Sequence, residues 1–161
     1  MDPFLWIDQL IGYYALSFSG SYDVCRVLLQ MAGERRSELA NALTYSQSAP
    51  LMWASLTDNL SVIELLVLNG ADPHAVNGQG ANAAHWAVSA GHLEVCQYLH
   101  ESHSVNFLLK DNYGKTPLDY ALAYDRKDVI DWLVQTFYPD RGHTGSESGP
   151  LRDKHASSST F

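Results

Sequence analysis

One pattern occurs repeatedly along this chain, at a nearly constant spacing. Residues 77–99 align without a gap with residues 111–133, a spacing of 34 residues. Further upstream, residues 53–66 align with residues 86–99 at a spacing of 33. A period of about 20–50 residues is typical of solenoids, in which each unit buries its apolar face against its neighbours. The sequence therefore predicts a stack of similar units.

Within each unit the apolar residues recur at helical spacing in two segments. Pro50 lies in the first turn of one such helix, where its missing N–H has no intrahelical partner to lose. Residues 61–68 form the next helix, which Asn69-Gly70 ends in the left-handed conformation that Gly permits. Residues 4–18 carry an apolar face that predicts a further helix. Residues 37–43 predict an extra helical turn between the first two units.

The residues that open the units carry a recognisable motif. Residues 116–121 read Thr-Pro-Leu-Asp-Tyr-Ala, and the equivalent residues 82–87 read Asn-Ala-Ala-His-Trp-Ala. With Gly70-Ala71-Asp72, they resemble the ankyrin repeat family, whose motif is T-P-L-H-x-A. The resemblance implies an all-α ankyrin-repeat solenoid of stacked helix-turn-helix units with short β-turn or hairpin loops. It implies an ankyrin-repeat domain over residues 1–138, with degenerate outer units acting as caps and units at about 4–43, 44–76, 77–110 and 111–138.

The last residues, 139–161, have a different composition. They are rich in Gly, Ser and Asp and show no apolar periodicity, so they are predicted to form a disordered tail. Ser159-Thr160-Phe161 also fits a C-terminal peptide ligand, a three-residue pattern that arises often by chance.

The charge distribution argues against one class of partner. Residues 1–138 hold 7 Lys/Arg against 15 Asp/Glu, so the repeats carry the whole formal charge of −8. Nucleic-acid binding depends on clustered Lys and Arg that neutralise phosphates. We therefore expect no nucleic acid among the partners.

The cysteines and the N-terminal residues predict a cellular compartment. Cys25 and Cys96 occupy equivalent positions two units apart, roughly 20 Å for packed helices, whereas a disulfide tolerates ~7 Å between Cα atoms. The first residues lack the basic and apolar regions of a signal peptide, and no segment is apolar enough to span a bilayer. The sequence predicts a monomer that is cytoplasmic or nuclear, without membrane partners.

A metal or catalytic site is the main alternative to a binding module. His92, Cys96 and His100 lie on one helical face and are residue types that bind zinc. Cys96, however, shares its repeat position with core residues, which favours a structural role. The resemblance implies that His85 is a hydrogen-bonding residue of the turn–helix junction, and no nucleophile stands in a recognisable motif beside it. No catalytic residue, metal or cofactor is expected, and the chain is predicted not to be an enzyme.

Three large aromatic residues, Trp53, Trp86 and Tyr120, share one repeat position. They form either a binding stripe or a row of core residues. The resemblance implies a large apolar residue packed between helices here, which favours the core. In that case Trp86→Ala costs about 3–5 kcal/mol of stability.

The resemblance also implies where a partner binds. The loop tips and the ends of the first helices vary within the family because they point outward. A small adaptor or inhibitor would bind another protein, of unknown identity, on this concave side. The alternative, equally open, is that these residues are only solvated. The candidate positions are Tyr45, Leu56, Thr57, Gln79, Ser89, Asn112, Tyr113, Lys115 and Tyr124, among which tyrosines are common interface anchors.

Overall fold

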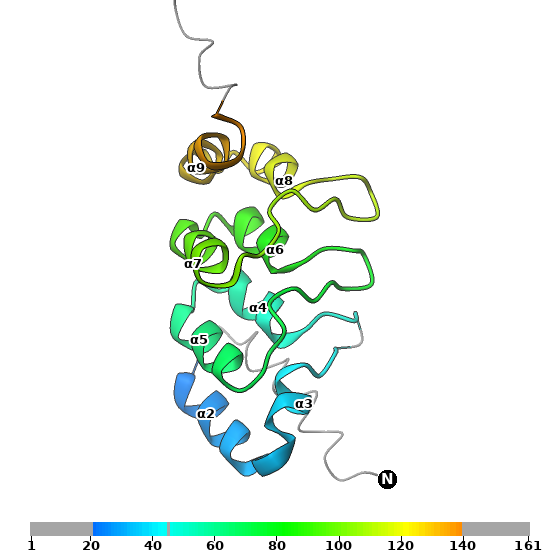
Figure 1. Cartoon of the computed structure of the whole chain (residues 1–161), viewed down its shortest axis with the longest axis vertical. Helices are drawn as coiled ribbons and strands as arrows, with labels where there is room; N and C mark the ends of the chain where they lie inside the picture. Colours follow the sequence, from blue (N-terminus) through cyan, green and yellow to red (C-terminus); the bar gives the residue numbers. More distant parts are fainter. Residues whose placement is uncertain (1–20, 45, 140–161) are drawn as a thin grey trace, which may run out of the picture.

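A computed structural model describes residues 21–44 and 46–139 of the chain. These residues form a stack of short helices, and the loops that precede α4, α6 and α8 project to the same side (Figure 1). Its helices are α2 (Tyr22–Met31), the 3-10 turn η1 (Gly33–Arg35), α3 (Arg36–Ala40), α4 (Pro50–Leu56), α5 (Leu60–Leu68), α6 (Ala83–Ala90), α7 (Leu93–His103), α8 (Pro117–Ala123) and α9 (Lys127–Phe137).

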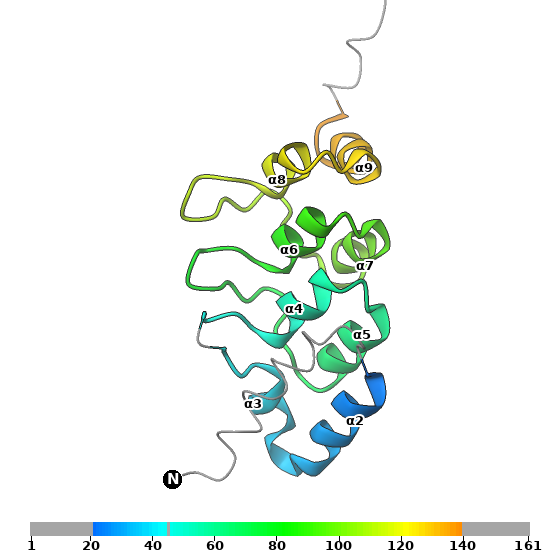
Figure 2. The same ribbon diagram turned by 180° about the vertical axis from the view of Figure 1, so that it is seen from behind.

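The helices stand in two rows. The first helices of the units, α4, α6 and α8, lie beside the projecting loops, and the second helices, α5, α7 and α9, lie behind them (Figures 1 and 2). We call the side formed by α4, α6, α8 and the loops the inner face. The described part of the chain contains no strand. The predicted all-α solenoid of helix-turn-helix units is therefore confirmed.

The projecting loops repeat one hydrogen-bonding scheme. In the loop 77–81 the backbone N–H of Asn77 donates to the carbonyl of Ala81 at 2.9 Å, and Gly80 N–H donates to Asn77 at 2.9 Å. The loop 111–115 repeats both bonds, and Thr44 and Ser48 are joined in the same way. We call these segments the hairpin loops. Gly80 and Gly114 have φ values of 74° and 72°, which an L side chain adopts only with strain.

Two of the first helices, α6 and α8, begin with reciprocal side-chain caps. Asp119 accepts from the backbone N–H of Thr116 at 2.8 Å, and the Thr116 hydroxyl accepts from Asp119 N–H at 3.4 Å. In the unit before it, Asn82 and His85 cap α6 by the same exchange. The two motifs differ in sequence, but both satisfy backbone donors that a helix N-terminus leaves free.

The core follows the repeat positions. Ala54, Ala87 and Ala121 are fully buried, which lets the first helices pack closely. The second helices bury a Val and a Leu each, at most 1% exposed: Val62, Leu66, Val95, Leu99, Val129 and Leu133. Full burial of one such side chain contributes about 1.5–3 kcal/mol, so the second helices supply much of the stabilising apolar contact.

The predicted extra helical turn is present as α3. Asn41, directly after it, donates from its side chain to the carbonyl of Gly70 at 2.7 Å and accepts from Asp72 N–H at 2.7 Å. A side chain at Gly70 would meet Ser37 Oγ at 2.8 Å. The inserted residues therefore pack against the turn that ends the next unit.

The change in spacing from 33 to 34 residues arises at the end of α7. Val105 N–H donates to the Leu99 carbonyl, six residues back, whereas Ala71 N–H donates to Leu66, five residues back. The additional residue thus lies between Leu99 and Val105, and Ser104 ends the helix with φ 52°.

Several predictions concern residues beyond the described ranges. The helix at 4–18, Tyr45 and residues 140–161 of the predicted tail lie outside them. Among the described residues no helix combines the length and apolar character needed to cross a membrane.

Candidate interaction surface

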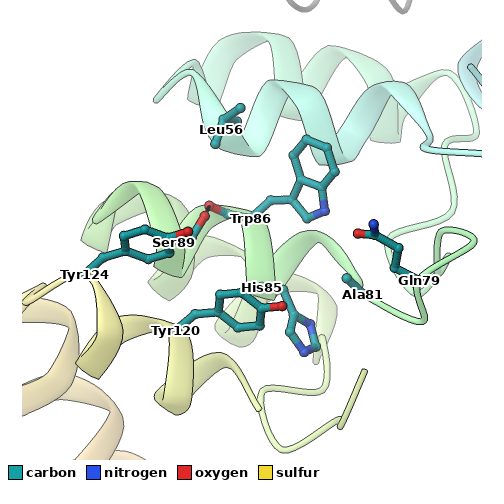
Figure 3. A pocket seen from close by; sticks show the side chains of 8 residues that line it. All are labelled: Leu56, Gln79, Ala81, His85, Trp86, Ser89, Tyr120 and Tyr124. Atoms are coloured by element: carbon teal, nitrogen blue, oxygen red, sulfur yellow. Dashed lines mark hydrogen bonds between the residues drawn. The ribbon is translucent and has the colours of Figure 1, made fainter. Parts of the chain in front are cut away.

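A hollow of about 250 Å³ opens on the inner face. Its walls come from α4, the hairpin loop 77–81, α6 and α8, so three successive units contribute (Figure 3). We call this hollow the groove. It is lined by Leu56, Gln79, Ala81, His85, Trp86, Ser89, Tyr120 and Tyr124.

The aromatic row runs into this groove. Trp53 and Trp86 meet edge to face with ring centroids 4.5 Å apart, and the row continues with Tyr120. All three residues are half-buried. The two alternatives that the sequence left open, a core row and a binding stripe, therefore both apply in part, because Trp86 and Tyr120 pack between units with one side and line the groove with the other. Large rings can do both, since burying one edge leaves another free for contact.

His85 lies at the floor of the groove. Its Nε2 is 3.2 Å from the carbonyl oxygen of Lys115, and its Nδ1 faces the Asn82 cap. Burial lowers the pKa of His85 below its usual 6.5, although the Lys115 carbonyl and the Asp111 carboxylate act in the opposite direction. The side chain therefore joins α6 to the next hairpin loop, the junction role that the resemblance implied.

Asp111 and Tyr120 fix the far wall. One carboxylate oxygen of Asp111 accepts from the backbone N–H groups of Tyr113 and Lys115, both at 2.9 Å. The other accepts from the Tyr120 hydroxyl at 2.6 Å. Burial would raise the pKa of Asp111, but these hydrogen bonds together lower it. The hydrogen bond between Tyr120 and Asp111 raises the pKa of Tyr120 to about 12. Tyr120 is thus held as a neutral donor, with its ring set against the groove.

The structure brings four of the candidate residues together at the groove: Leu56, Gln79, Ser89 and Tyr124. Leu56 ends α4 and is 36% exposed, and Tyr124 directly follows α8 and is 56% exposed. Tyr120 and Tyr124 are stacked at 6.5 Å. Two Tyr rings and one Leu side chain therefore present apolar surface at the rim.

The other described candidates have different surroundings. Tyr113, at the tip of its hairpin loop, is 68% exposed. Asn112 joins two hairpin loops, since its backbone N–H donates to Gln79 at 2.8 Å and its amide donates to Gly78 at 3.1 Å. Thr57 donates from its hydroxyl to Ala54. Lys115 offers its carbonyl to His85, while its side chain is exposed.

The zinc alternative is not supported by the positions of its three residues. His92 Nε2 is 2.9 Å from the Leu56 carbonyl, and His100 packs among Phe107, Trp132 and Phe137. Cys96 is fully buried, and burial raises its pKa to about 12, which disfavours the thiolate that binds metals. No group of three or more His, Cys, Asp or Glu in the described ranges is arranged to hold a metal ion.

The sequence did not place His85 at a binding surface, and it favoured the core over a binding stripe for Trp86 and Tyr120, which the structure shows lining the groove. Their repeat positions suggested the turn–helix junction for His85 and helix packing for the two aromatic residues. The sequence carried one signal for the aromatic residues, the size of the side chain. A large ring next to a buried Ala is long enough to reach beyond its own helix to the surface. Periodicity alone places a residue on a face but does not show how far it reaches.

Comparison with known proteins agrees with the repeat architecture. A family model described as ankyrin repeats, in three copies, matches residues 51–141. A liver-isoform mitochondrial glutaminase of Mus musculus is 30% identical over 88 residues, 55% of this chain and 14% of that enzyme. An ankyrin repeat protein of Rickettsia bellii is 33% identical over 75 residues, 46% of this chain and 41% of that protein.

An L-asparaginase of Dirofilaria immitis is 32% identical over 83 residues, 52% of this chain and 14% of the enzyme. The chain thus spans less than half the length of each of these relatives, and the similarity to the two enzymes lies in the repeat region. The family model, by contrast, covers more than half of the chain and includes α5 to α9 and all of α4 except Pro50. The chain therefore belongs to the ankyrin-repeat family, whose repeats mediate binding to other proteins.

Proposed function

We propose that this chain is a non-enzymatic adaptor or inhibitor that binds another protein through its inner face. The groove between three successive units carries the proposal. Its exposed Leu56 and Tyr124 rim and its half-buried Trp86 and Tyr120 walls resemble the anchors that dominate protein interfaces. Aromatic rings contribute large contact areas while losing little conformational entropy.

The size of the groove favours a protein partner over a small molecule. At about 250 Å³ it is below the ~300 Å³ at which sites for drug-sized ligands begin. It accommodates single side chains of a protein whose remaining contacts fall on the hairpin loops. Tyr113 and Lys115 stand at those loops and extend the surface.

The lining also supports a binding role rather than catalysis. His85 has its ring nitrogens directed at Asn82 and Lys115, and Asp111 already accepts three hydrogen bonds. A general acid or base needs to reach the reacting proton directly or through one water. His85 is instead engaged at the junction between units, and Asp111 is engaged by the hairpin loop and by Tyr120 of its own unit. We place the chain in the cytoplasm or the nucleus and expect it to act as a monomer.

The test is affinity capture from cells with two matched double variants. Leu56→Ala/Tyr124→Ala removes the rim of the groove. Leu68→Ala/Tyr22→Ala removes a more exposed Leu and a slightly less exposed Tyr from α5 and α2, at 83% and 43% exposure. Exposed side chains contribute little to folding, so both variants should melt close to wild type.

We expect a partner recovered with wild type to be lost from the rim variant and retained by the control. Truncation of an interface anchor costs about 2 kcal/mol or more, roughly 30-fold in affinity. Retention by the rim variant, or equal loss from both variants, would reject the inner face as the binding surface.

A further inference from the structure

The groove lacks acidic side chains although the chain is acidic overall. None of its eight lining residues is Asp or Glu, in a sequence whose net charge is −8. The carboxylate of Asp111 lies behind Tyr120, and both of its oxygens are engaged. An aromatic pocket can bind a cation, but none of the lining residues here carries a carboxylate to neutralise one.

A positive charge stands at the rim instead. Arg126 donates from Nε to the carbonyl of Ser89 at 2.9 Å, which attaches it to the last turn of α6. Its guanidinium carbon is 6.0 Å from the centre of the Tyr124 ring. The guanidinium thus lies over a rim residue and would repel a cation that entered the groove.

The position of Arg126 depends on a glycine. A Cβ at Gly91 would lie 2.9 Å from Arg126 Cδ. Because Gly91 has no side chain, Arg126 has room to extend from the start of α9 to α6. Gly91 also has φ 88° as the C-cap of α6. The arginine is therefore supported along its length, which reduces the entropy lost when its guanidinium binds an acidic group.

A second hollow, separate from the groove, has Arg126 in its wall. It has a volume of about 150 Å³ and includes Gly91, Arg126, Lys127 and Asp128 in its lining. Asp125 and Asp128 are neighbours in sequence, yet Arg126 forms no ion pair within the described ranges. The guanidinium fork is therefore open to a carboxylate from outside, which it can bind through two parallel hydrogen bonds.

We propose that the partner inserts a large apolar side chain into the groove and places an Asp or Glu carboxylate on Arg126. This inference rests on the proposed function and names the chemistry of the segment bound there. The two contacts are adjacent, because Ser89 and Tyr124 line the groove and also touch Arg126. A short acidic segment with an aromatic or aliphatic anchor matches both.

A random peptide library displayed on phage is the probe, selected on the immobilised full chain. Parallel selections use Arg126→Gln, Tyr124→Ala and the matched control Arg36→Gln. Arg36 also donates from Nε to a backbone carbonyl, that of Gly33 at 2.7 Å, but it lies on α3. Arg126→Lys, which keeps the charge, is included in case Arg126→Gln melts below the control.

Peptides enriched on wild type should pair a large apolar residue with Asp or Glu and should fail to bind Tyr124→Ala. Replacing the peptide carboxylate by its amide should weaken binding to wild type and Arg36→Gln about 10-fold, the size of a charge-assisted hydrogen bond. The same replacement should leave binding to Arg126→Gln unchanged. Binding of the acidic peptide to Arg126→Lys should fall between the two.

Two results would overturn the inference, and they differ in what else they reject. Peptides that need Tyr124 but show no acidic preference, or prefer Lys and Arg, would refute the carboxylate contact and leave the proposed function standing. If no enriched peptide depends on Tyr124, the groove is not a binding site, and both proposals fail.

Discussion

Single residues on the inner face carry structural and surface roles at once. Tyr120 donates to Asp111 at 2.6 Å, which orders a hairpin loop, while its ring lines the groove. His85 lies edge to face with Tyr120 at 5.8 Å and bonds to the same loop through Lys115. A change at either residue therefore disturbs both the stack and the binding surface, and variants there must be interpreted with stability data beside them.

His85 predicts a dependence of stability on pH. Burial lowers its pKa in the folded state below the unfolded 6.5, so the unfolded chain binds the proton more readily. Stability is then greatest above pH 6.5 and decreases as the pH falls toward the folded pKa, by at most about 1.4 kcal/mol per pH unit. Urea unfolding at pH 7 and pH 5 should show a larger loss for wild type than for His85→Gln. The six other histidines are common to both proteins, so equal losses would contradict this role.

Trp86→Ala tests how far the aromatic row belongs to the core. Complete burial of Trp would make the substitution cost about 3–5 kcal/mol, and half-burial with a single edge-to-face contact to Trp53 reduces that to about 2 kcal/mol. Chemical denaturation measures the difference. A loss near 5 kcal/mol would mean that the ring is internal, and no loss would mean that it is only solvated.

At the scale of elements, the hairpin loops are coupled through Asn112. It bonds to the backbone of Gln79 and Gly78, so the loop of the fourth unit rests on that of the third. Side chains and backbone of neighbouring loops thus form a continuous edge to the inner face. This arrangement fixes the position of Gln79 relative to Tyr113 on the inner face.

Substitutions at two glycines distinguish the free-energy cost of backbone strain from the cost of disturbing the contact between hairpin loops. Gly80 and Gly114 have nearly equal positive φ, but a Cβ on Gly80 would meet Asn112 Oδ1 at 2.6 Å, whereas Gly114 has nothing within 4 Å. Gly114→Ala should cost about 1 kcal/mol, the left-handed penalty, and Gly80→Ala should cost at least about 1 kcal/mol more. Thermal or urea unfolding compares them. Equal costs would show that Asn112 moves aside freely and that the loops are not coupled.

Much of this element scheme was predictable from the sequence, because the repeat fixes which positions are equivalent. The 34-residue step and the end of α5 at Asn69-Gly70 follow from local patterns, as does the extra helical turn, which was predicted at 37–43 and lies at Arg36–Ala40. The reach of Trp86 and Tyr120 into the groove was not predictable, since it depends on the spacing between units. The contact of Arg126 with Ser89 was also missed, because it joins side chain and backbone across 37 positions and leaves no periodic signal.

At the scale of the whole molecule, the main contacts between units in the described residues join neighbours: α2 with α5, α4 with α6, α6 with α8 and α7 with α9. Between the last two units, Phe107 is 1% exposed and packs with Trp132 and Phe137 at centroid distances of 5.2 and 5.7 Å. His100 adds a fourth ring. In such a quasi-one-dimensional protein, stability is close to a sum of unit and interface contributions.

Phe107→Ala should therefore loosen one end of the molecule selectively. Loss of a buried aromatic side chain costs about 3–5 kcal/mol at this interface. Hydrogen–deuterium exchange should become faster in α8 and α9, while α4 and α5 keep wild-type rates because no lost contact reaches them. Uniformly faster exchange across all helices would show that the chain unfolds as one cooperative unit instead.

Binding of a protein partner to the inner face is tested most directly by hydrogen–deuterium exchange of the complex. Deuterium uptake is compared with and without the captured partner across every described helix. Protection is expected in the hairpin loops 77–81 and 111–115 and in α6 and α8, with α5, α7 and α9 unchanged. Protection confined to α5, α7 and α9 would contradict the account, because the partner would then bind the opposite side of the stack.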